Sequence, residues 1–245
     1  MIFSLKKRKA SKKDYSFHRS HKLGVLALPS ELTFLSPILS QDAEDCTAFS
    51  AVATRDDEIL NGNFDPMEFW KDELAFANDT TSQGYNLEVP AAVGVKIGFS
   101  PMGNPTLRQN KASAYFWITS GGQDLFDNIR NAIYYNQRPV MGGLDWYTDY
   151  NNSDTITKIG SILLGGHAIK IAGWTTKNGV PLLVLQNSWG TNIGDQGKFY
   201  MTREAANKAF APYGIFYWSD SQDFKVKTLG LILALWINIK TLLHL

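Results

Sequence analysis

Cysteine is nearly absent from this chain of 245 residues, and its scarcity limits both compartment and chemistry. The single cysteine, Cys46, has no second cysteine with which to form an intramolecular disulfide. Many secreted enzymes depend on such bridges, so we expect an intracellular or particle-associated protein. Apart from histidines near the two ends, the chain has only His167. One cysteine and one histidine cannot supply a zinc ligand set, so we predict no metal and no other cofactor.

Charge of one sign is concentrated only at the N-terminus. The net charge is +1, and 19% of residues are charged, which favours neither nucleic acid nor an acidic substrate for the body of the chain. Eight of the 24 basic residues lie between Lys6 and Lys22, against one acid, Asp14. We predict that residues 1–28 form a solvated basic tail, with anionic lipid, nucleic acid or an acidic protein as alternative partners. No apolar stretch there is long enough for a secretory signal peptide.

Long apolar runs are also missing, except at the C-terminus. Residues 221–245 contain a nearly uninterrupted apolar run from Thr228 to Ile239. With the residues that follow, its length is at the lower limit for a membrane-spanning helix. Lys225 and Lys227 precede it and would favour the cytoplasmic side. We expect this segment to associate with a membrane, with docking on this protein or a partner as the alternative.

Residues 29–220 form the predicted globular domain. Asp65 and Pro66 have the signature of a helix start, because an N-cap acid precedes a proline at the first helical position. Gly and Asn punctuate the apolar runs of the second half, as in a mostly antiparallel sheet. Helices followed by strands indicate an α+β protein of two subdomains with a cleft between them. Helices are predicted at Cys46–Leu60, Pro66–Asn78, Val89–Ile97 and Asp124–Tyr135, and strands at Ala114–Thr119, Pro139–Gly142, His167–Trp174, Pro181–Gln186 and Gly197–Thr202.

Cys46 lies where a polar loop gives way to a predicted helix. A lone cysteine is more often a small packing residue than a nucleophile. At a helix N-terminus, however, free backbone N–H groups and the helix dipole stabilise a thiolate and lower its pKa. Cys46 is therefore a candidate nucleophile.

His167 and Asn187 are the candidate partners of that nucleophile. His167 follows two glycines and opens a predicted strand, where close approach to other groups is possible. Asn187 follows another apolar strand and is a candidate to accept a hydrogen bond from the imidazole and fix its orientation. Trp189 is placed to cover that bond and exclude water.

These segments resemble the papain-like cysteine peptidases. The resemblance rests on Gln41 with Cys46–Ser50, on Gly165–Ala168, and on Asn187–Gly190, which occur in the order that this family has. His167 and Asn187 follow Cys46 by 121 and 141 residues. That spacing is close to the separation of about 130–150 residues expected in the family. The resemblance covers residues 29 to about 218.

The resemblance implies both a fold and a set of roles. The fold would be α+β, with a helical left domain, an antiparallel β-barrel right domain and the active site in the cleft between them. Cys46 would attack the scissile carbonyl, His167 would transfer protons, and Asn187 would orient His167. Gln41 and the Cys46 backbone N–H would form the oxyanion hole. The resting pair would be a thiolate and an imidazolium.

Two departures from the family pattern bear on function. Gln41 lies five rather than six residues before Cys46, and the loop between them carries three carboxylates that would raise the thiol pKa. We expect a cysteine-type endopeptidase that cleaves proteins or peptides through a thioester and has no nucleic-acid partner for its peptidase domain. The alternatives are an inactive papain-like fold that serves as a binding or structural module, and an amidase acting on non-protein amides.

Overall fold

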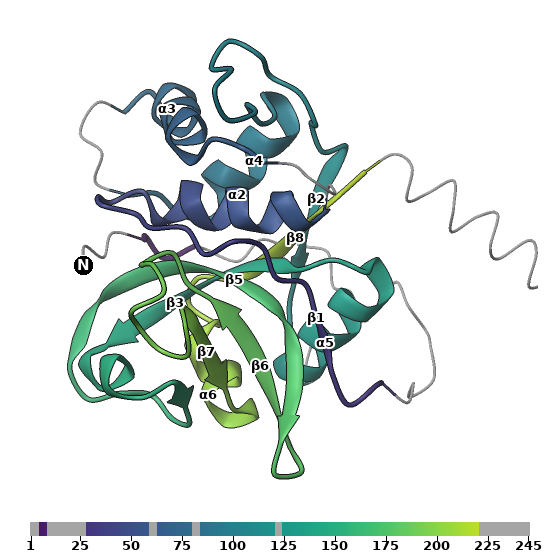
Figure 1. The fold of residues 1–245 in the computed structure, drawn as a ribbon, viewed down its shortest axis with the longest axis vertical. Coiled ribbons are helices and arrows are strands. Elements are labelled where there is room, and N and C mark those ends of the chain that lie inside the picture. The colour runs from purple at the N-terminus through teal and green to yellow at the C-terminus, as the bar shows by residue number, and fades with distance from the viewer. Residues whose placement is uncertain (1–4, 9–27, 59–62, 80–83, 121–123, 221–245) are drawn as a thin grey trace, which may run out of the picture.

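The computed structural model describes residues 5–8, 28–58, 63–79, 84–120 and 124–220, which form two halves that meet along one helix. Figure 1 shows the helical half above the sheet, with α2 lying between the two. The helical half contains α2 (Cys46–Glu58), α3 (Pro66–Ala77) and α4 (Glu88–Lys96). Two further helices, α5 (Leu125–Asn136) and α6 (Arg203–Ala209), pack against the core of the sheet. The α+β prediction is confirmed.

Helix α3 begins and ends where its local sequence predicts. The Asp65 side chain accepts hydrogen bonds from the backbone N–H groups of Met67 and Glu68, so it satisfies two donors that the helix cannot. Pro66 occupies the first turn, where its missing N–H costs nothing. Asn78 closes the helix in the left-handed conformation, with φ of 50°. These caps fix α3 and the side chains it directs toward α2.

Helix α2 lies between the two halves because its buried residues are small. Ala48, Ala51 and Val52 are fully buried, and small side chains allow the helix axis to approach the sheet closely. The Ser50 hydroxyl donates a 2.8 Å hydrogen bond to the carbonyl of Ala168 on β5 (Leu163–Lys177). The start of α2 is thereby held against the middle of β5.

Within the described residues, the strands form one eight-stranded sheet in the order β2-β8-β3-β5-β6-β7-β4, with β1 added to β5. The pairings among them are antiparallel except for the parallel pair β4 and β7. The central strands β3 and β5 are buried along most of their length. Besides β5, the strands are β1 (Leu32–Thr33), β2 (Ala114–Ile118), β3 (Val140–Tyr147), β4 (Thr155–Ile156), β6 (Val180–Gln186), β7 (Lys198–Met201) and β8 (Ile215–Ser219).

A fully buried lysine reinforces the contact between the halves. Lys170 on β5 pairs with Asp57 of α2 and donates 3.0 Å hydrogen bonds to Ser36 and Gln186. A buried cation needs such partners, since an uncompensated one would cost several kcal/mol. The cluster therefore joins α2, the segment around Ser36, and the strands β5 and β6.

Two strands are longer than the sequence indicates. We predicted that β3 ends at Gly142 and that β5 begins at His167, because the glycine pairs there interrupt the apolar pattern. In the structure Gly143 pairs with Ala168, and Asp145 pairs with Gly166, so cross-strand pairing carries both strands past their glycines. The elements β1, β4, β8, α6 and the 3₁₀ helix Thr148–Asn152 were not predicted.

The apolar C-terminal segment, residues 221–245, lies outside the described residues. Within the described part of the chain, no helix combines the length and the apolar character needed to cross a bilayer. The expectation that the C-terminal segment contacts a membrane or a partner stays a prediction.

The pairing of β1 with β5 leads to a stability prediction at Gly173. A Cβ built on Gly173 would lie 1.9 Å from the carbonyl oxygen of Leu32, and neither backbone can move away without breaking the β1–β5 pair. Gly173→Ala should therefore lower the free energy of unfolding by about 3 kcal/mol or more. Urea unfolding followed by circular dichroism measures this change.

Gly179→Ala is the matched control. Gly179 also has positive φ, of +77°, but a Cβ added there would meet no heavy atom within 4 Å. Its loss should be only about 1 kcal/mol, the cost of the backbone conformation alone. Equal losses for the two variants would contradict the steric argument.

Candidate active site

Cys46 is the first residue of α2, as predicted, and is 1% exposed. Its thiol lies at the end of the helix where backbone N–H groups have no partners within the helix. A backbone hydrogen bond from Ala168 also reaches the thiol and lowers its pKa. Because Ala168 directly follows His167, this contact places the candidate nucleophile beside the candidate base.

His167 is hydrogen-bonded to Asn187. The distance between His167 Nε2 and Asn187 Oδ1 is 2.8 Å. The backbone N–H of Ser188 donates to the same Oδ1 atom at 2.8 Å, which identifies that atom as the amide oxygen. Since Oδ1 only accepts, Nε2 must carry a proton. The other ring nitrogen, Nδ1, is then the atom available to exchange a proton during a reaction.

Two tryptophans enclose the imidazole. The Trp189 ring stacks on His167 with ring centroids 4.3 Å apart and an angle of 30° between the planes. Trp146 packs edge-on against both, at 5.5 Å from His167 and 4.8 Å from Trp189. The structure places Trp189 where the sequence predicted it. Trp146, which the sequence did not single out for this contact, helps to bury the imidazole.

The electrostatics of the enclosed pair oppose charge separation. Burial raises the pKa of Cys46 to about 12, and the nearby carboxylates of Glu73 and Asp45 add to this effect. Burial lowers the pKa of His167 to about 4, although the Asn187 hydrogen bond acts in the other direction. Burial of both groups thus opposes the ion pair that the family resemblance implies, which stays a prediction.

Gln41 lies next to the residue that follows Asn187. Its backbone N–H donates to Ser188 O at 2.8 Å, and its side-chain carbonyl accepts a hydrogen bond from the Ser188 hydroxyl. The Gln41 amide nitrogen donates to Ala43 O at 3.0 Å, which uses one of its two hydrogens. The shortened loop thus still brings Gln41 to the site. Its role as an oxyanion donor stays a prediction.

Glu73 on α3 is a buried acid that sequence reasoning missed. Its side chain is fully buried, and one carboxyl oxygen accepts a 2.7 Å hydrogen bond from the Thr47 hydroxyl, next to Cys46. Burial raises the pKa of Glu73 well above its usual value, so burial favours the protonated form of this carboxyl. No pattern in the sequence marks Glu73, because only the packing of α3 on α2 brings it to the nucleophile.

Residues 5–8 lie between the two halves, where they are drawn in purple in Figure 1. The backbone N–H of Leu5 donates to Gly166 O at 3.0 Å, and that of Lys6 donates to Tyr85 O at 3.0 Å. Leu5 is 5% exposed and packs against Gly143 and Gly166, where a built Cβ would come within 2.4 Å of Leu5 atoms. The expectation of a solvated tail does not hold for Leu5 and Arg8, whereas the Lys6 and Lys7 side chains are exposed.

Comparisons with known proteins give a family match for part of this chain and a fold match for most of it. Residues 105–213, which include His167 and Asn187 but not Cys46, match the papain family of cysteine proteases. The structure of xylellain, a cysteine protease from Xylella fastidiosa, superimposes with a TM-score of 0.69 at 16% identity, over 89% of this chain and 96% of that one. The chain resembles the papain-like cysteine peptidases in both sequence and fold. The predicted fold is confirmed.

Further relatives agree with this papain-like assignment. The structure of procathepsin B S9 from Trypanosoma congolense has a TM-score of 0.67 at 16% identity, over 89% of this chain and 86% of that one. Cathepsin B-like cysteine proteinase 3 of Caenorhabditis elegans is 37% identical over 76 residues, which are 30% of this chain and 20% of that protein. The cathepsin B-like cysteine proteinase of Schistosoma japonicum is 30% identical over 120 residues, 46% of this chain and 35% of that protein. The matches thus span about a third or less of these curated relatives.

The buried carboxyl of Glu73 generates a pH prediction. The folded chain keeps a proton on Glu73 that the unfolded chain releases above pH of about 4.3, so this group makes stability fall as pH rises toward the folded-state pKa. Glu73→Gln removes that dependence. The variant should therefore gain in Tm relative to wild type as the pH is raised from about 5 to about 8.

Thermal unfolding followed by circular dichroism across that pH range measures the difference. Glu204→Gln is the control, because Glu204 is exposed and a hydrogen bond from Lys208 lowers its pKa. The control should show no gain with rising pH. A constant Tm difference between Glu73→Gln and wild type would refute the buried-acid argument.

Proposed function

We propose that this chain is a cysteine-type endopeptidase that hydrolyses peptide bonds through a thioester on Cys46. The observation that carries the proposal is the His167–Asn187 hydrogen bond under Trp189, which lies beside the start of α2 where Cys46 stands. A nucleophile, a base and a group that orients the base are thereby brought together from α2, β5 and the end of β6.

The proposed reaction uses these groups in two steps. Cys46 Sγ bonds to the carbonyl carbon of the substrate, and the thiol proton passes to His167 Nδ1. His167 returns that proton to the amide nitrogen as the C–N bond breaks, and a thioester remains on Cys46. Water then attacks the thioester with His167 as base, releasing the acid and restoring the thiol. The Cys46 N–H and the Gln41 amide would stabilise the oxyanion by about 3 kcal/mol each.

Residues 5–8 hold this proposed enzyme in a covered state. Leu5 fills the space in front of Gly166, the residue before His167, so a substrate must displace it. Burial is the largest cause of both pKa shifts, and residues 5–8 would add to it by covering the site. Release of the segment would hydrate both groups and favour the ion pair.

The same shifts favour one alternative function. A thiol with a pKa of about 12 is a poor nucleophile near neutral pH. If the cleft never opened, the chain would act as a papain-like binding or structural module. Reactivity of Cys46 separates this alternative from the peptidase.

Labelling by an epoxide inhibitor of papain-like peptidases tests the proposal. The chain has one cysteine, so mass spectrometry reports modification of Cys46 alone. We expect labelling that is abolished in Cys46→Ala and strongly reduced in His167→Ala, because a neutral thiol without its base reacts slowly. Absence of labelling in a folded chain whose cleft has been opened would support the binding module.

Opening of the cleft is tested by Leu5→Asp. A charge in the apolar space that Leu5 occupies should expel residues 5–8, since burying a leucine side chain stabilises by about 2 kcal/mol. The labelling rate should rise about tenfold or more relative to wild type. Leu107→Asp is the control, because Leu107 is exposed. Equal rates in wild type and Leu5→Asp would show that the segment does not limit access.

A further inference from the structure

Arg8 is held more specifically than any other charged residue of the segment in the cleft. Its guanidinium carbon lies 3.7 Å from the centroid of the Trp117 ring, a stacked cation–π contact. Its Nε donates a 3.1 Å hydrogen bond to Glu88 Oε1, and its backbone N–H donates to Pro212 O at 3.3 Å. The Arg8 side chain is only 6% exposed, whereas that of Lys7 is 60% exposed.

The groups around Arg8 come from separate elements that the fold brings together. Trp117 lies on β2, Glu88 opens α4, and Gly214 precedes β8. A Cβ at Gly214 would lie 3.1 Å from the Trp117 ring and 3.7 Å from Arg8 Cδ, so a larger residue there would crowd the stacked pair. Gly214 also has φ of +88°, which favours glycine. The surface facing Arg8 is therefore shaped for a flat cation.

A cavity of about 430 Å³ continues from this contact. Its walls are partly apolar and partly polar, so it has room for the residues that flank an arginine in a longer peptide. Among the residues that line it, beside Arg8 and Trp117, are Ser120, Leu125, Asn207 and Tyr213.

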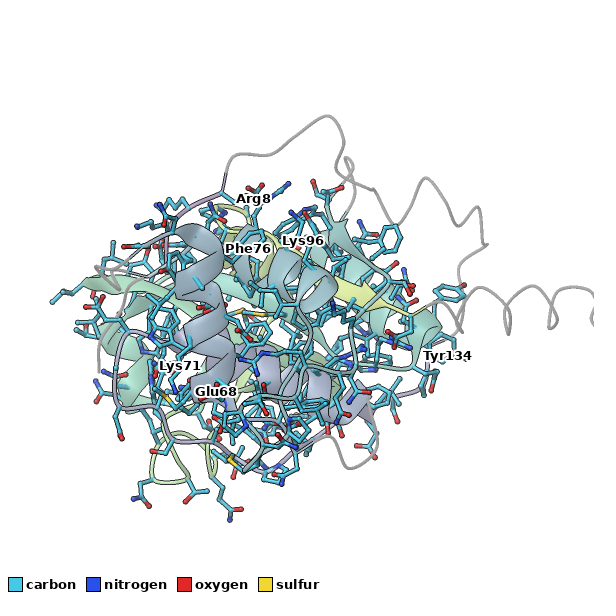
Figure 2. All side chains as sticks on the ribbon, turned by 90° about the horizontal axis from the view of Figure 1, so that it is seen from above. Arg8, Glu68, Lys71, Phe76, Lys96 and Tyr134 are labelled. Atoms are coloured by element: carbon cyan, nitrogen blue, oxygen red, sulfur yellow. The ribbon has the colours of Figure 1, made fainter. Side chains whose placement is uncertain are left out.

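Glu88 is the acid available to pair with an arginine at this contact. Glu68, an acid in the first turn of α3, is paired with Lys71 at 2.6 Å and with Arg108 at 3.4 Å. Figure 2 shows Glu68 and Lys71 on the side of the molecule opposite Arg8 in that view. Glu88 is half exposed, so its carboxylate is accessible to an incoming cation.

We propose that Trp117 and Glu88 form an arginine subsite of the cleft, which Arg8 occupies in the covered state and a peptide arginine occupies once residues 5–8 leave. The ligand class is a peptide that carries an apolar residue for the space between Gly143 and Gly166 and an arginine three residues away, as Leu5 and Arg8 do. Lysine fits less well, because its ammonium group has no plane to stack on the indole. The inference deepens the proposed peptidase function, but peptide binding tests it without any cleavage.

The test uses a full-length chain that has no nucleophile and an emptied cleft: Cys46→Ala with Leu5→Asp and Arg8→Ala. The probe is a fluorescein-labelled peptide with the sequence of residues 2–9, and its binding is measured by fluorescence anisotropy. Two further probes replace its arginine with lysine or with citrulline, which keeps the shape but lacks the charge. Circular dichroism establishes that each variant is folded.

We expect the arginine peptide to bind the emptied chain about tenfold more tightly than the citrulline peptide, and the lysine peptide to bind with intermediate affinity. Adding Glu88→Gln should reduce the arginine-to-citrulline ratio to about twofold or less, whereas Glu204→Gln should leave it unchanged. Equal affinities for the three peptides, or no binding to a folded emptied chain, would overturn the subsite. Failure of the peptidase proposal would instead show in epoxide labelling, which this assay does not involve.

Discussion

The contact between α2 and β5 is the constraint on which the rest of the site depends. The Ser50–Ala168 hydrogen bond and the Lys170–Asp57 pair hold the two elements together along the helix that begins at the candidate nucleophile. Cys46 and His167 come from different halves, so this contact helps to set their relative position. The Ser50–Ala168 hydrogen bond and the Lys170 side chain are buried, where a lost partner costs far more than at the surface. Polar groups thus hold α2 against β5, while the small residues of α2 allow the two elements to approach closely.

The exclusion of water from around the imidazole has two opposing effects. Trp189 and Trp146 strengthen the His167–Asn187 hydrogen bond by excluding water from it. The same exclusion penalises a charged imidazole and a charged thiolate, and both pKa shifts have burial as their largest cause. A site of this kind needs controlled access of water or substrate before it can react. The segment Leu5–Arg8, which borders both halves, is placed to provide that control.

Local signals in the sequence located much of the fold and site, and long-range contacts account for what was missed. The Asp65–Pro66 start of α3 is encoded within four residues, and so is the Asn187–Gly190 turn that carries Trp189. Glu73 and Trp146 carry no such signal, because tertiary packing alone brings them to Cys46 and His167. The basic composition of the N-terminal segment gave no sign that residues 5–8 pack between the two halves. A run of cations predicts a solvated tail, yet one leucine and one stacked arginine were sufficient to seat that part of it.

Covalent attachment changes how the cleft segment competes with other ligands. Leu5 and Arg8 belong to the same chain as Gly166 and Trp117, so their local concentration at the cleft does not fall when the protein is diluted. A tethered ligand of this kind acts at an effective concentration on the order of millimolar. A peptide in solution must exceed that value, or bind more tightly than Leu5–Arg8, before it enters. Cutting the chain beyond Arg8 would turn the same segment into an ordinary ligand that dissociates and is lost on dilution.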